Sequence, residues 1–181
     1  MAAASNLLLL LPLLCLGVVG QSLSDGTVQS YAEISPAGSS LDSGEHYGSA
    51  LTPIGDLDGD GIGDMLVGAE YNDDGGQRRG AVFVFFLNAD GTRKAEQKIS
   101  DTAGYGGRLT LANNDYFGCA VTSLSTGVIA VGGYKQDDGG TANGAVWVIH
   151  LTTNGFVDTV QMISDTQGGL STPLGSNDYF G

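Results

Sequence analysis

The feature that most constrains this chain of 181 residues is an internal repeat with a period of 64 residues. Residues 80–84 (GAVFV) return as residues 144–148 (GAVWV), and the block ISDT at 99–102 returns at 163–166. The block NDYFG at residues 114–118 returns at the end of the chain, at an offset of 63. Repetition at such a period is typical of propellers and solenoids, whose units bury their apolar faces against one another.

Each repeat contains four short segments that are rich in Val, Ile, Phe and Leu and are bounded by Gly, Asn and Asp, which is typical of strands. The third segment of each repeat is almost wholly apolar, which indicates a strand buried on both faces. Sheets that stack around an axis cover both faces of such strands, as in a β-propeller. With 30 glycines, long helices are not expected. We therefore predict an all-β fold with strands at 47–53, 64–69, 80–87, 94–100, 117–123, 127–132, 144–151 and 157–163, preceded by one at about 27–35.

Two short motifs add a family resemblance. Phe117-Gly118 and Phe180-Gly181 begin one block, and Gly68-Ala69 and Gly132-Gly133 end another, with an acidic loop between the corresponding positions of the first repeat. This order resembles the FG-GAP repeat of the seven-bladed propeller in integrin α subunits and related exported proteins. The resemblance implies propeller blades that are four-stranded antiparallel sheets.

The resemblance also gives the chain an expected organisation. Seven repeats need more residues than this chain has, and the last motif breaks off at Gly181. We therefore expect an incomplete ring, with the chain a fragment of a longer protein or one of several chains that close a ring together. The expected parts are a signal peptide at 1–20, the last strand of a preceding or ring-closing blade at 21–36, repeat one with its acidic loop at 37–100, repeat two at 101–164, and a truncated third repeat at 165–181.

The acidic loop of repeat one has the sequence DLDGDGIGD over residues 56–64. Carboxylates at alternating positions of a tight loop, with glycines that permit the turn, suit Ca²⁺, which takes six to eight oxygen ligands. Position 12 from the start of the loop holds valine rather than the glutamate of an EF-hand. The alternative is a solvated acidic turn. The predicted ligands are the carboxylates of Asp56, Asp58, Asp60 and Asp64 and the carbonyl of Ile62.

Repeat two lacks this loop. Its segment from Gly118 to Val131 is shorter than the one from Gly48 to Val67, and residues 122–127 carry no carboxylate. We therefore expect one calcium ion for the two repeats. The pairs Asp73-Asp74 and Asp137-Asp138 precede Gly-Gly and are interpreted as turns.

The N-terminus and the charge bear on location. Residues 7–19 form a short apolar run, which predicts a secretory signal; an uncleaved anchor is the alternative. We therefore expect a secreted or cell-surface protein, associated with a membrane only if the full-length chain has an anchor. The mature chain would keep one cysteine, Cys119, so it would have no internal disulfide. The net charge of −13 argues against a nucleic-acid partner.

No nucleophile–base pair, histidine cluster or phosphate loop stands out in the sequence, so we expect no enzyme. The leading hypothesis is an exported calcium-binding module for adhesion or ligand binding. By resemblance to integrin-like propellers, a protein or carbohydrate ligand would bind at the loops opposite the calcium loop, at 70–79, 101–115, 134–143 and 165–178. The alternatives are a non-catalytic part of a secreted hydrolase, such as a phospholipase D-type enzyme, and a purely structural surface protein.

Overall fold

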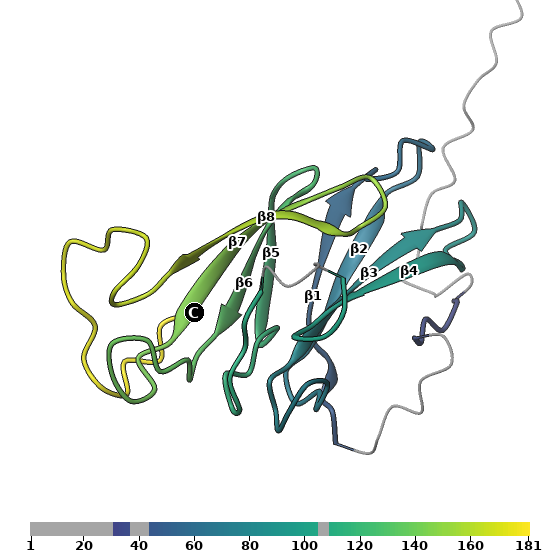
Figure 1. Ribbon diagram of the computed structural model, residues 1–181. Helices are drawn as coiled ribbons and strands as arrows, with labels where there is room; N and C mark the ends of the chain where they lie inside the picture. Colours follow the sequence, from purple (N-terminus) through teal and green to yellow (C-terminus); the bar gives the residue numbers. More distant parts are fainter. Residues whose placement is uncertain (1–30, 37–43, 105–108) are drawn as a thin grey trace, which may run out of the picture. The chain divides into compact units, whose positions relative to one another are not determined.

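A computed structural model describes residues 31–36, 44–104 and 109–181 (Figure 1). Residues Ala32–Gly181 form one compact unit that contains all eight strands. The described residues form strands, turns and loops without a helix, which confirms the predicted all-β class, and none of them belongs to a helix that could span a membrane. The strands are β1 (Tyr47–Gly55), β2 (Asp64–Ala69), β3 (Ala81–Leu87), β4 (Arg93–Ile99), β5 (Ala120–Ser125), β6 (Val128–Gly133), β7 (Ala145–Leu151) and β8 (Val157–Ile163).

The strands form two separate antiparallel sheets, in the orders β1-β2-β3-β4 and β5-β6-β7-β8. The two sheets use the same register: Val67 pairs with Phe83 in the first, and Val131 pairs with Trp147 in the second. Each sheet is a four-stranded meander built from one repeat, as expected for FG-GAP propeller blades. The described residues form two blades and not a closed ring.

Two predicted segments differ from the observed ones by more than two residues. The strand expected at 117–123 begins only at Ala120, because Phe117 forms a parallel bridge with Gly80 of the first repeat instead of joining its own sheet. The segment expected as a strand at 27–35 lies partly outside the described residues, and its described part, 31–35, is not in a strand. There, Ile34 packs beside the apolar cluster of the first blade and its carbonyl accepts a hydrogen bond from the Tyr47 hydroxyl.

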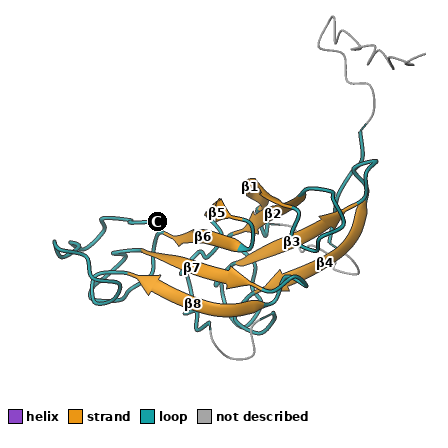
Figure 2. Ribbon diagram, turned by 90° about the horizontal axis from the view of Figure 1, so that it is seen from above, coloured by secondary structure: helices purple, strands orange, loops and turns teal. Residues whose placement is uncertain are grey.

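The third strand of the first blade is buried on both faces, as its apolar sequence predicted: residues 81–86 are all buried. Val82, Val84 and Phe86 face the larger core, which also contains residues of the second blade. Phe83 and Phe85 face a smaller cluster on the other side. The two sheets therefore share one core, with β1 next to β5 in both views (Figure 2).

The NDYFG block joins one blade to the next. The N–H of Phe117 donates to the Arg79 carbonyl at 3.0 Å, and its fully buried ring lies edge-on to Trp147 of the second blade at 5.3 Å between centroids. Gly80 lies against this block with φ of 86°, and a Cβ there would collide with the Phe117 backbone. Phe180 repeats the arrangement with Gly144 of the second blade.

The paired aspartates hold the loops at the ends of β2 and β6. In repeat one, Asp73 Oδ1 accepts from the Arg78 N–H at 2.6 Å, and Asp74 accepts from the Ser100 hydroxyl at 2.6 Å. In repeat two, Asp137 Oδ1 accepts from the Ala142 N–H at 2.7 Å, and Asp138 accepts from Ser164 and Thr166. These hydrogen bonds agree with the interpretation of both pairs as turn residues.

Candidate metal centre

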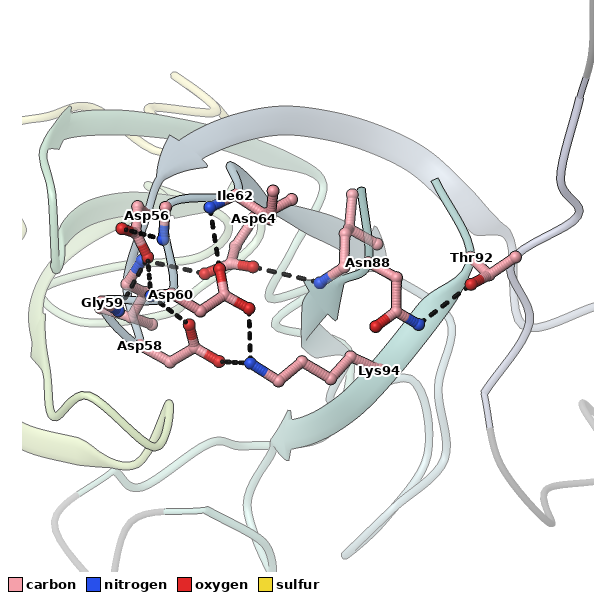
Figure 3. Close-up of polar contacts among 12 residues, drawn as sticks. Asp56, Asp58, Gly59, Asp60, Ile62, Asp64, Asn88, Thr92 and Lys94 are labelled. Atoms are coloured by element: carbon pink, nitrogen blue, oxygen red, sulfur yellow. Dashed lines mark hydrogen bonds and ion pairs between the residues drawn. The ribbon is translucent and has the colours of Figure 1, made fainter. Parts of the chain in front are cut away.

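The acidic loop connects β1 to β2 and curls around the side chain of Asp56 (Figure 3). Asp56 Oδ1 accepts hydrogen bonds from the N–H groups of Gly59 at 2.7 Å and Asp60 at 3.0 Å. Its Oδ2 accepts from the Gly61 N–H at 2.8 Å. Gly59 and Gly61 have φ of 81° and 88°, a region that glycine enters without strain, so the sequence permits this tight path.

Asp64 is the anchor of the site, because it starts β2 and only 2% of it is exposed. Its Oδ2 accepts from the Leu57 N–H at 2.9 Å, and its Oδ1 accepts from the Leu87 N–H at 3.1 Å. It thereby ties the loop to the end of β3. Burial raises the pKa of its carboxyl above the ordinary value, by more than the two N–H donors lower it. A nearby cation would stabilise the charged form of this carboxylate.

Three of the predicted ligands come together. Carboxylate oxygens of Asp56, Asp58 and Asp64 all lie within 4.8 Å of one another, and in the described part of the chain this is the one such group of three acidic, His or Cys side chains. Asp60 lies outside the group: its Oδ1 accepts from the Ile62 N–H at 2.8 Å. The oxygen donors of the group are those that Ca²⁺ prefers, so the residues fit a calcium ion.

Lys94 is a part of the site that the sequence analysis missed. This residue lies on β4, and its Nζ is 2.7 Å from Asp58 Oδ2 and 2.5 Å from Asp60 Oδ2 (Figure 3). The hydrogen bond from Lys94 holds the pKa of Asp60 below its ordinary value, and the two carboxylates raise the pKa of Lys94. The available signal in the sequence was the scarcity of bases, seven Lys and Arg against 20 acids, which makes each base a candidate partner of the acidic loop.

The loop is also packed against the second blade. Leu57 is buried in the core that contains Ile129 and Val157, and it lies next to Gly127. Gly127 belongs to the two-residue turn that joins β5 to β6 at the position where repeat one has the acidic loop. A change in the conformation of the acidic loop would therefore alter the packing between the blades.

The connections at the other end of the blades carry a row of aromatic side chains. Tyr116 of the NDYFG block lies between Tyr71, which follows β2, and Tyr134, which follows β6. Its ring is tilted by 56° to that of Tyr71, at 5.2 Å between centroids, and stacks on that of Tyr134 at 5.0 Å. Cations lie on these rings: the Arg78 guanidinium is 4.8 Å from the centre of Tyr71, and Lys135 Nζ is 4.9 Å from that of Tyr116. The row runs across both blades through His46, Tyr71, Tyr116, Tyr134 and Tyr179.

Comparison with known proteins matches both blades to FG-GAP repeats, at residues 47–85 and 111–149. Integrin alpha-IIb of Homo sapiens is 41% identical over 56 residues, which is 31% of this chain and 5% of that protein. Integrin alpha-PS2 of Drosophila melanogaster is 54% identical over 39 residues, which is 22% of this chain and 3% of that protein. The similarity thus spans a small part of the length of these relatives.

Proposed function

Since this chain is an FG-GAP repeat protein with two blades of the integrin type, we propose that it is an exported, calcium-binding and non-catalytic module for adhesion or ligand binding. The observation that carries the calcium assignment is the group of three carboxylates, Asp56, Asp58 and Asp64, that the acidic loop brings within 4.8 Å. The relatives named as integrins support an adhesion-type role and a secreted or cell-surface location.

One ion per two repeats is proposed, held by the three grouped carboxylates with Asp60 and the Ile62 carbonyl beside them. A bound calcium ion would supply the positive charge that lets these carboxylates stay ionised close together. Asp64 links this site to β3 through Leu87, and Leu57 links it to the second blade. The loop residues would in this way stiffen the contact between the blades when the ion is bound.

A protein or carbohydrate partner is proposed for the end of the blades opposite the calcium loop. The aromatic row supports this assignment, because Tyr rings offer large amphipathic contact areas at low entropic cost. Tyr179 at 47% exposed and His46, which is also exposed, leave ring surface open there. Arg78 is exposed and sits over Tyr71, so a partner with acidic or polar groups would meet a cation at the aromatic row.

The calcium proposal is tested by thermal melts and titration calorimetry of the chain with Asp58→Ala plus Asp60→Ala. Binding to the native form alone stabilises it by about 2.7 kcal/mol at a hundredfold excess over Kd, and exported modules often need about 10⁻⁴–10⁻³ M calcium. We expect the parent to bind one ion and gain stability, and the double variant to lose this gain.

The matched control is Asp137→Ala plus Asp138→Ala, which removes the same charge from the loop after β6. This control should be less stable without calcium, because it loses the bonds to Ala142 and Ser164, but its calcium-dependent gain should equal that of the parent. No gain in the parent, or equal losses of the gain in both double variants, would refute the assignment.

A further inference from the structure

We propose that Lys94 is a built-in counter-cation of the acidic loop, which stabilises the ion-free loop and lowers its affinity for calcium. This inference rests on the proposed calcium site. It concerns how that site is regulated: one protein cation and one free cation would share the carboxylate of Asp58. The affinity of the site for calcium would then depend on a residue of β4, which lies outside the acidic loop in the sequence.

The geometry carries the first step. Asp58 is a member of the group of three carboxylates, and its Oδ2 is also 2.7 Å from Lys94 Nζ. Asp60, the acid of the loop that lies outside this group, pairs with the same ammonium at 2.5 Å. Lys94 thus holds two of the four predicted carboxylates from the side of β4, and the lysine reaches toward both of them in Figure 3.

The charges carry the second step. Four carboxylates within nine residues repel one another, and Lys94 offsets part of this repulsion by bridging two of them. The same positive charge repels a divalent cation at the neighbouring group of three. Lys94 therefore has opposite effects on the two states: it favours the ion-free loop and disfavours the loaded one.

The comparison of the two repeats carries the third step. The residue 64 positions after Lys94 is Asp158. Lys94 lies at the irregularity near the start of β4, directly after Arg93, which pairs with Leu87. Asp158 lies at the same place in β8, directly after Val157, which pairs with Leu151. Repeat two has lost the acidic loop and has an acid at this position. Within this chain, the lysine is present in the repeat that has the acidic loop and absent from the repeat that lacks it. This is expected if the lysine interacts with the loop.

The test is Lys94→Gln, compared with the parent and with Lys98→Gln. Lys98 lies on the same strand and pairs with Asp74 at 3.0 Å, so the control loses an equal charge and an ion pair at a distance from the loop. We expect Lys94→Gln to bind calcium roughly tenfold more tightly, because a nearby positive charge is removed. In chelator, it should melt below the parent. Lys98→Gln should keep the parental affinity, and Lys94→Arg should restore it.

The outcomes separate the inference from the calcium site itself. Parental or weaker calcium binding by Lys94→Gln, in a parent that does bind, would overturn the inference and leave the calcium site standing. Absence of binding in both the parent and Lys94→Gln would overturn both proposals. Binding that becomes measurable only in Lys94→Gln would support both. Added salt provides a further check, because screening should narrow the difference in affinity between parent and variant.

Discussion

Phe117→Ala should uncouple the two blades. Phe117 belongs to the NDYFG block between the repeats, yet its ring is completely buried in the core that the two blades share. It lies edge-on to Trp147 of the second blade, with an interplanar angle of 82°. Its N–H also donates to Arg79 in the loop between β2 and β3, so it contacts both blades at once.

The expected cost follows from this burial. Truncation of a fully buried Phe to Ala costs about 3–5 kcal/mol, which combines lost transfer free energy and the cavity left behind. Loss of an edge-to-face aromatic pair adds about 0.5–1.5 kcal/mol beyond the area term, which places Phe117→Ala in the upper half of that range. Domains of this kind are stable by only about 5–15 kcal/mol, so the loss is a large share of the total.

The chain provides its own control in Phe180→Ala. Phe180 stands in an identical NDYFG block and bridges Gly144 as Phe117 bridges Gly80, but its side chain is only partly buried. The local hydrogen bonding is the same, with an N–H bond of 2.9 Å to Asn143. Because cost scales with the apolar surface returned to water, we expect Phe180→Ala to lose no more than about 1–2 kcal/mol.

The assay is urea unfolding followed by Trp147 fluorescence and, separately, by circular dichroism. In a repeat protein, stability is approximately a sum of unit terms and of interfaces between neighbours. Loss of the interface should therefore lower the midpoint and separate the two probes, since Trp147 reports on the second blade. Equal losses for both Phe variants, or a loss below about 1 kcal/mol for Phe117→Ala, would refute the role of Phe117 between the blades.

Two further predictions concern the backbone and the pH dependence. Gly80→Ala should lower the free energy of unfolding in urea clearly more than Gly91→Ala. Both residues have positive φ, for which a side chain costs about 1–2 kcal/mol, but only at Gly80 would a Cβ collide with Phe117. Similar losses for the two variants would contradict the tight contact at Gly80. Burial raises the pKa of Asp115 to about 6, so the folded state holds a proton there that the unfolded state releases, and this group makes the parent less stable as the pH rises from about 4 to 6. Asp115→Asn should remove this decline, because its amide oxygen can still accept from the Ala112 N–H but does not titrate. The difference in unfolding free energy between variant and parent should therefore grow by about 2–3 kcal/mol from about pH 4 to 6. A difference that does not depend on pH would contradict this prediction.

The strands were largely predictable because their signals are local. A largely apolar run that follows Gly identifies β3 and β7, and the observed bounds differ from the predicted ones by one residue. The repeat itself predicted two equivalent sheets, since similar residues at equal spacing face similar neighbours. The acidic loop was also readable, because its acids lie within nine residues and the glycines among them permit the turn that gathers Asp56 and Asp58.

Contacts between distant segments were not predictable in the same way. The start of β5 was misplaced because Phe117 pairs with Gly80, which lies 37 residues earlier, and this bridge depends on how one blade stacks on the other. The aromatic row likewise draws its rings from loops of both repeats. Such contacts follow from register and stacking, which a periodic pattern along one segment does not contain.

The acidic loop shows the division most clearly. The sequence alone placed four acids within one nine-residue turn, whose glycines permit the path that brings carboxylates close together. Only the tertiary structure decided that Asp64 is buried under two N–H donors, that Asp60 turns away from the group, and that Lys94 reaches the loop from β4. The antiparallel pairing of β3 with β4 brings this lysine back to the acids more than 30 residues after them, and so a long-range contact completes the electrostatics of a locally encoded site.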